Sequence, residues 1–314
     1  MWPGVRRNLL LVLCSFALVT AAAGRAGAQA IPAAPPVALD RFSPAEAGSG
    51  WFTADQLSWR GHLTWVAGVV TDEAYRPLVA KSDAGAPDQA VVSNQLTTHL
   101  QGALTIADRY RVSLSLPLVL LESGDAAVVG GVSYPTPGAG VGDPRLGGTA
   151  RLFTDARGVI TGAAGLTMDI PLFLGGRHYG HEESLRLRPY FAAAGERDWL
   201  AYAGCAGFLI HAPRDLSSEL PLGTSFEIAG AVGARLWHRR ILVGPELFAS
   251  TMLDGPGPFS RGTSPLEILL GAHYRHESGF GAGLGLGTGL SQAVGTPPFR
   301  MVLSVSYTPT TATK

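Results

Sequence analysis

The sequence predicts an all-β fold: a transmembrane antiparallel β-barrel of about 12 strands, with long extracellular loops and short periplasmic turns. Three observations lead to this fold class. Apolar residues alternate with polar or small residues in segment after segment, as in strands with one apolar face. Long and short connections alternate between these segments. With 41 glycines and 15 % charged residues in 314, the composition is rich in glycine and poor in charge.

Residues 1–30 are predicted to be a cleaved signal peptide. Arg6 and Arg7 precede an apolar run, and small residues lead to a cleavage site after Ala28 or Ala30. The run is shorter than the roughly 20 residues that a membrane-spanning helix needs, which disfavours a signal anchor. No comparable apolar run follows, so we expect strands, not helices, to cross the membrane.

The rest of the chain divides into three predicted regions. Residues 31–54 are rich in Pro, Ala and Gly, which predicts an irregular periplasmic leader. Residues 55–307 predict the outer-membrane β-barrel, and residues 308–314 a C-terminal tail. Cys205 is the one cysteine beyond the signal peptide, so no internal disulfide is expected.

The first predicted strand, at about 57–69, places Leu57 and Trp59 on its apolar face. Pro, Gly and charged residues then predict a long loop at 72–88. Further strands are predicted at about 89–106, 110–121, 143–153, 158–172, 185–194, 199–210, 225–237, 240–252, 265–275, 280–290 and 298–307. The pattern assigns no inner or outer face to the strand at 199–210.

The hairpin at 265–290 shows the strand pattern most clearly. Ile268 and Leu270 share one face of its first strand with other apolar residues, while Glu267 belongs to the opposite face. After a four-residue break, glycine occupies every second position of 281–289, which predicts a strand with a small inner face.

The connections predict that both termini and the short turns lie in the periplasm, with loops such as 122–142 outside the cell. Aromatic residues beside the short turns suggest an interface girdle, although parity turns Phe153 and Trp237 away from the lipid. A soluble β-sandwich is disfavoured because the only lysines, Lys81 and Lys314, lie outside the strands, whereas solvent-facing strands usually carry them.

Strand parity directs nine arginines and four acids toward the lumen. They are Arg60, Arg111, Arg145, Arg151, Arg186, Arg188, Arg235, Arg275 and Arg300, with Asp169, Glu227, Glu246 and Glu267. One interpretation is a lumen closed by Arg–carboxylate pairs. The other is a narrow channel that favours anions because arginines outnumber acids. The sequence leaves both open.

Other kinds of chemistry find little support. The loop around 177–183 concentrates His and Glu but lacks the second His of the HExxH zinc motif, so we expect a solvated loop and no metal or other cofactor. No GxSxG motif is present, and no His–Ser pair is predicted on the outer rim, as an outer-membrane phospholipase would need. Without the signal peptide, 21 basic residues face 24 acidic ones, which gives no basic excess for nucleic acid.

Five stretches carry a family resemblance. They are SGWFTADQLSWRGHL (49–63), GDPRLG (142–147), LVGPELFAST (242–251), SPLEILLGAHYR (264–275) and GTPPFRMVLSVSY (295–307). They resemble the N-terminal β-barrel of OmpA-family outer-membrane proteins of the myxobacterial type. The resemblance implies a structural or interaction barrel in a Gram-negative outer membrane, in contact with its lipid, that could let small anions or other solutes pass. The chain departs from the family after Tyr307, where a C-terminal peptidoglycan-binding domain commonly follows, so we expect no peptidoglycan partner.

Overall fold

The computed structural model describes most of the chain after residue 37. The described residues are 38–59, 61–80, 88–129, 132–157, 159–172, 178–182, 184–210, 223–254 and 257–309. The predicted signal peptide and most of the predicted tail lie outside them. Within the described residues, no helix is long and apolar enough to cross a membrane.

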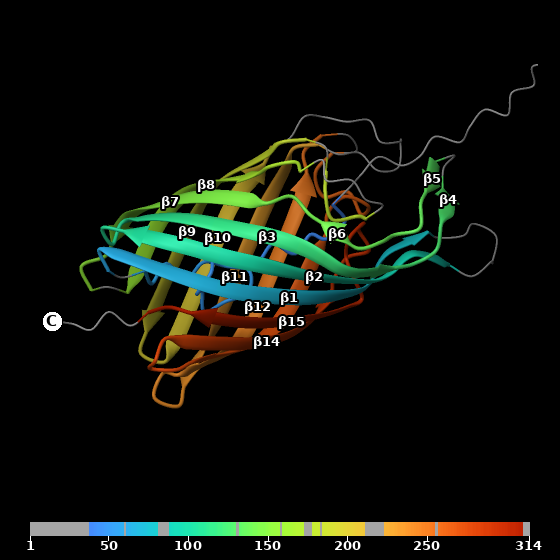
Figure 1. Ribbon diagram of the computed structural model, residues 1–314. Coiled ribbons are helices and arrows are strands. Elements are labelled where there is room, and N and C mark those ends of the chain that lie inside the picture. Colours follow the sequence, from blue (N-terminus) through green and yellow to red (C-terminus); the bar gives the residue numbers. More distant parts are fainter. Residues whose placement is uncertain are drawn as a thin grey trace, which may run out of the picture. The chain divides into compact units, whose positions relative to one another are not determined.

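Twelve long strands of the described chain form one closed antiparallel barrel (Figure 1). They are β1 (Leu63–Ala80), β2 (Gln89–Ile106), β3 (Tyr110–Ser123), β7 (Arg145–Thr154), β8 (Ile160–Asp169), β9 (Arg186–Arg197), β10 (Leu200–Leu209), β11 (Ser225–Leu236), β12 (Ile241–Met252), β13 (Leu266–Arg275), β14 (Phe280–Gly289) and β15 (Phe299–Tyr307). Each pairs with the next, and β15 returns to β1, where Ala67 lies opposite Tyr307. This closure leaves no free edge in the wall and confirms the predicted fold class and strand number.

Three short strands of the described chain add to this wall or stand beside it. β4 (Ala127–Val129) and β5 (Val132–Tyr134) form a two-stranded sheet of their own. β6 (Gly140–Val141) pairs with β3. All three lie within the long connection predicted at 122–142.

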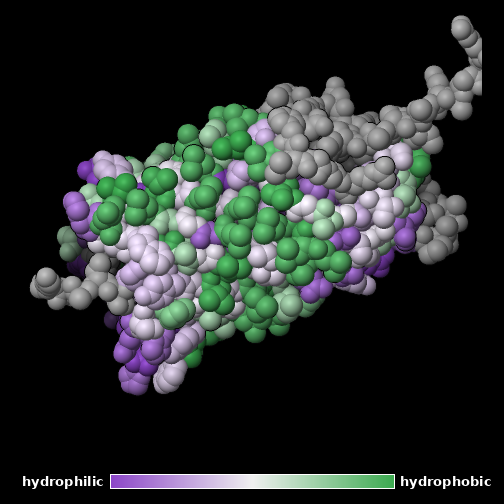
Figure 2. Space-filling model, in the orientation of Figure 1, coloured by the Kyte–Doolittle hydropathy of each residue, from purple (hydrophilic) through white to green (hydrophobic). Residues whose placement is uncertain are grey.

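The outer surface of the wall is apolar. Along β13, Leu270 is 62 % exposed, whereas Glu267 and Leu269, on the opposite parity, are fully buried. Figure 2 shows apolar side chains gathered in a band across the strands, with hydrophilic residues towards the ends of the wall. A barrel whose outer face meets lipid requires this arrangement.

β1 starts and ends later than predicted. The loop predicted at 72–88 is wrong for residues 72–80. The strand includes them, because it continues past Pro77 and pairs Leu78 with Val92. The register shifts around Pro77, where the missing backbone N–H is tolerated at a bulge. Residues 81–87 lie outside the described chain.

A second register shift corrects the predicted face of an aromatic residue. The pairing of β7 with β8 shifts between Arg151 and Phe153. An extra residue reverses the parity of everything beyond it, so Phe153 points outward and is 54 % exposed. Trp237, also predicted to face away from lipid, is 57 % exposed and lies beside Tyr274 with ring centroids 6.0 Å apart. Both residues therefore extend the predicted aromatic girdle.

Residues 38–59, here called the interior segment, run through the inside of the barrel. Leu39 N donates to the Tyr179 carbonyl among the long connections, while Gly61 N donates to Asp108 in the short turn after β2. The segment has no regular secondary structure, but the predicted location of residues 38–54 in the periplasm is wrong.

Apolar side chains explain why the interior segment is held inside. Trp51, Leu57 and Trp59 are 2 %, 2 % and 7 % exposed and pack against a wall rich in alanine. These wall alanines are Ala163, Ala192, Ala194, Ala201, Ala203 and Ala231. Leu57 and Trp59 therefore face the interior, not the lipid as predicted. Ala201 and Ala203 also assign the inner face of β10, which periodicity left open because both of its faces carry small residues.

The alternating glycines of β14 make room for a second aromatic contact. A Cβ atom at Gly285 would lie 2.7 Å from the ring of Phe52, and one at Gly283 would lie 3.0 Å from it. Phe52 is 2 % exposed and clusters with Phe42, Leu269 and other apolar residues. The small inner face predicted for this strand is therefore a seat for the interior segment.

Candidate functional site

The lumen is the candidate site, and it is partly filled. Arg60 lies outside the described residues. The other predicted lumen residues contact one another, the interior segment or acids that the sequence analysis did not identify: Arg111, Arg145, Arg151, Asp169, Arg186, Arg188, Glu227, Arg235, Glu246, Glu267, Arg275 and Arg300.

Arg300 is the centre of an acid-rich cluster. Its guanidinium lies 2.7 Å from Asp72, 2.9 Å from Glu267 and 2.9 Å from Asp40 of the interior segment. The exposed fraction of Arg300, Asp72 and Glu267 is at most 1 %. Full desolvation of an arginine is tolerated when several carboxylates satisfy its donors. Asp72 escaped the sequence analysis because it was assigned to a loop.

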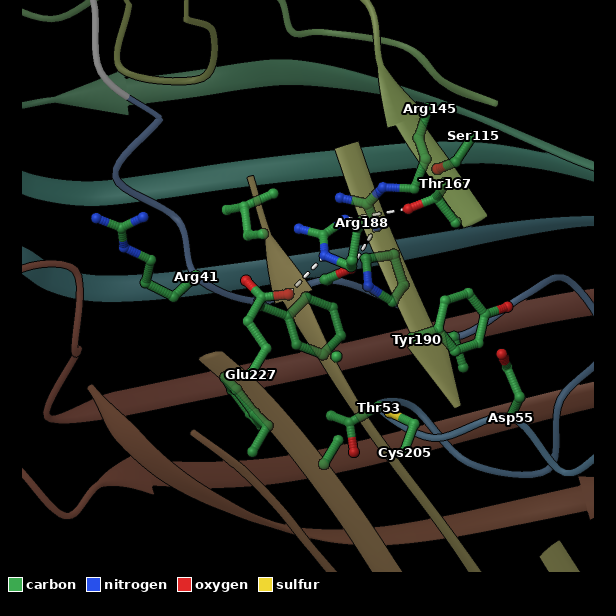
Figure 3. Close-up of a pocket in the computed structure, with 18 of the residues that line it drawn as sticks. Arg41, Thr53, Asp55, Ser115, Arg145, Thr167, Arg188, Tyr190, Cys205 and Glu227 are labelled. Carbon is green, nitrogen blue, oxygen red and sulfur yellow. Dashed lines mark hydrogen bonds and ion pairs between the residues drawn. The ribbon is translucent and has the colours of Figure 1, made fainter. Parts of the chain in front are cut away.

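Three further arginines meet around Asp169. Arg145 Nε lies 2.8 Å from Asp169, and Arg188 Nε lies 2.5 Å from Glu227 (Figure 3). Arg186 is 2.9 Å from Asp143 and also contacts Glu182. Asp143 and Glu182 lie in connections that turn inward. Asp143 shares the parity of Arg145 in the strand predicted at 143–153 but was not counted as inward, and Glu182 was assigned to a loop.

Glu246 binds the backbone of the interior segment. Its Oε2 accepts hydrogen bonds from Phe52 N at 2.8 Å, Thr53 N at 2.9 Å and Thr53 Oγ1 at 3.0 Å. Its Oε1 lies 3.1 Å from His273 Nε2. This buried carboxylate therefore satisfies three donors of a segment that has no strand partner of its own.

The arginines near the short turns also hold the interior segment. Arg151 donates to the carbonyls of Leu57 and Trp59 at 3.0 and 2.9 Å. Arg275 donates to the Gly48 carbonyl at 2.7 Å. These guanidiniums donate to backbone carbonyls that have no strand partner. Strand parity alone could not predict this role of the arginines.

The predicted excess of five lumenal positive charges is wrong. Further acids face the lumen: Asp40, Glu46 and Asp55 of the interior segment, Asp72 and Glu196 of the wall, and Asp143 and Glu182 of the inward connections. The count from strand parity omitted them because most lie outside the predicted strands. The lumen therefore gives no general attraction for anions.

Two cavities remain beside the interior segment. One of about 180 Å³ is lined by Arg145, Arg188, Tyr190, Cys205 and Glu227, among others (Figure 3). The other, of about 920 Å³, lies nearer the short turns, where Asp108, Arg235 and Arg275 contribute to its lining. Polar and charged groups converge in both, as they do in sites that accept small polar molecules.

The prediction that the loop at 177–183 is solvated is wrong for its described residues, 178–182. His178 and His181 are 5 % and 8 % exposed, with ring centroids 4.4 Å apart. Burial, together with His181, lowers the pKa of His178 to about 4. Tyr179 N donates to Glu122 at 3.0 Å, which ties this loop to the wall. Arg177 and Glu183 lie outside the described residues, among which no group of three or more candidate metal ligands occurs.

No protein-family model and no curated protein matches this chain. Solved structures do. A crystal structure of an outer membrane channel from Pseudomonas putida F1 covers 80 % of this chain and 97 % of its own, with a TM-score of 0.56 and 12 % identity. A NanC porin structure covers 77 % of this chain and 98 % of its own, with a TM-score of 0.51 and 9 % identity. At these identities the likeness shows the fold: a closed barrel of the outer-membrane channel and porin type.

Proposed function

We propose that this protein is an outer-membrane channel for small solutes, in which solute passes beside the interior segment and not through an empty lumen. The likeness in fold to outer-membrane channels supports a pore-like barrel. On this proposal the barrel is surrounded by the lipid of the outer membrane, and the cargo that it carries is a small solute. We expect no catalytic activity. Kinship with OmpA-family proteins stays a prediction from the sequence.

One observation carries the proposal. The cavity near Arg188 and the cavity near the short turns both include Glu46, Ala47 and Asp55 in their lining. We call these three residues the neck. A path that continues through the neck would join the two cavities, and its narrowness would limit cargo to small molecules.

A second candidate is a closed structural or interaction barrel. The hydrogen bonds of Glu246 and the ion pair between Arg300 and Asp40 favour it, because they hold the interior segment in place. The two candidates predict different conductance for the same protein.

Conductance of the refolded full-length protein in planar bilayers tests the proposal. We expect small discrete steps, and we expect Ala47→Phe to reduce them because the added ring fills the neck. Ala126→Phe is the matched control, because Ala126 is exposed in the connection after β3. A change in gel mobility on boiling verifies that each variant has folded, since a closed barrel leaves no edge from which unfolding can start. Absence of conductance from folded wild-type protein would favour the closed barrel.

A further inference from the structure

We propose that Asp55 determines the charge preference of the passage and favours small solutes that carry a positive group, such as an ammonium. This inference rests on the proposed channel function and names the class of its cargo. It assigns selectivity to the interior segment, whereas strand parity had pointed to the arginines of the wall.

The position of Asp55 is the first argument. Together with Glu46 and Ala47 it belongs to the lining of both cavities. Figure 3 shows Asp55 beside Tyr190 on one side of the cavity near Arg188, away from Arg188 and Glu227 themselves. A solute that moves between the cavities therefore has to pass this carboxylate.

The second argument is that the charge of Asp55 has no ion-pair partner among the described residues. Its Oδ1 accepts a hydrogen bond from Glu46 N at 2.9 Å. Arg111 and Arg145 lie close enough to attract it. Each of them, however, directly contacts another acid: Arg111 contacts Glu46 at 2.7 Å, and Arg145 contacts Asp169 at 2.8 Å.

The neck, counted together with Arg111, therefore carries one net negative charge. Glu46 is balanced by Arg111, Ala47 is uncharged, and Asp55 is left over. In a narrow passage with low-dielectric walls, a single uncompensated charge at the constriction outweighs paired charges elsewhere, because every solute passes close to it. Cations and ammonium groups are attracted there, and anions are repelled.

The surroundings of the neck fit a cargo that carries both signs of charge. On the short-turn side, Arg275 lines the larger cavity and donates a hydrogen bond to the Gly48 carbonyl. A carboxylate of the solute could contact Arg275 while the ammonium contacts Asp55. Zwitterions should therefore pass more readily than simple anions of the same size.

Reversal potentials under a KCl gradient test this assignment. We expect the wild-type channel to prefer potassium and Asp55→Asn to lower the potassium-to-chloride permeability ratio several-fold. The asparagine keeps an oxygen that can accept from Glu46 N. Asp125→Asn, the same change at an exposed loop position, should leave the ratio unaltered. A wild-type channel that prefers chloride, or a ratio that Asp55→Asn leaves unchanged, overturns the proposal.

A second readout does not depend on conductance. In a Cys205→Ala background, Ser113→Cys would place a thiol in the lining of the cavity near Arg188, beside Glu46 of the neck, where cationic and anionic methanethiosulfonate reagents compete. We expect the cationic reagent to react faster, and adding Asp55→Asn should reduce its advantage several-fold. If this holds while bilayers show no current, the proposed channel fails but the charge assignment stands. Failure of both reagents to react, an anionic reagent as fast as the cationic one, or rates indifferent to Asp55→Asn overturns the assignment.

Discussion

Replacing Glu246 by alanine should loosen the interior segment. This carboxylate is completely buried and accepts hydrogen bonds from two backbone N–H groups and one hydroxyl of the segment. Alanine would leave the donors of Phe52 and Thr53 inside the barrel without this acceptor. The wall itself should remain closed, because the backbone pairing of β12 with its neighbours does not involve this side chain.

The size of the effect follows from the three donors. A buried donor left without a partner costs about 1–3 kcal/mol, so three of them weaken docking of the segment by at least about 3 kcal/mol. Each 1.4 kcal/mol is roughly a tenfold change in an equilibrium. The population of undocked segment should therefore rise by about two orders of magnitude. Glu246→Gln retains an acceptor oxygen and should have a smaller effect.

Hydrogen exchange of the segment backbone measures this change in the folded barrel, and bilayer conductance reports whether the passage widens. Glu227→Ala is the control, because Glu227 pairs with Arg188 of the wall and has no hydrogen bond to the segment. We expect protection of Phe52 and Thr53 to fall in Glu246→Ala alone. Equal protection in wild type and Glu246→Ala would refute the idea that Glu246 retains the segment.

Three further predictions concern the glycine seat, the lipid face and the inward loop. Gly285→Val should destabilise the protein by about 1–3 kcal/mol through its clash with Phe52. This cost should shrink when Phe52→Ala is added, and denaturation of the two single mutants and the double mutant measures the difference. Leu270→Arg, on the outer face of β13, should cost about 2–4 kcal/mol in lipid, whereas a similar stability for Leu270→Met and Leu270→Arg would contradict the lipid-facing assignment. The loop holding His178 should be most stable above pH 6.5 and open progressively as the pH falls toward 4, since His178 takes up a proton in the open loop that it excludes in the closed loop. Comparing hydrogen exchange of wild type and His178→Gln separates this effect from a general effect of acid.

Much of the wall was predictable from the sequence because its physics is local. Side chains of a strand alternate with a period of two, so polar and apolar faces can be read from neighbours such as Glu267 and Ile268. The prediction failed where the period was interrupted. The register shifts near Pro77 and Phe153 are set by pairing with the adjacent strand, which a single segment does not reveal.

The charge balance of the lumen was less predictable, because its partners come from distant parts of the chain. Arg300 pairs with Asp72 across the barrel closure and with Asp40 of the interior segment. Neither acid belongs to a strand position that parity could mark as inward, since one was assigned to a loop and the other to a leader. Counting charges strand by strand therefore gave an excess of arginine that the folded chain does not have.

The interior segment left two signals in the sequence that were assigned to other causes. Leu57 and Trp59 alternate with polar residues, and alternation alone does not distinguish a side chain that faces lipid from one that packs inside a barrel. The glycines of β14 are the better signal. An inner face without side chains leaves a hollow that must be filled, and Phe52 fills it. A glycine stripe on a barrel strand, combined with aromatic residues just before the first strand, therefore argues for an occupied lumen and for selectivity set by the occupant.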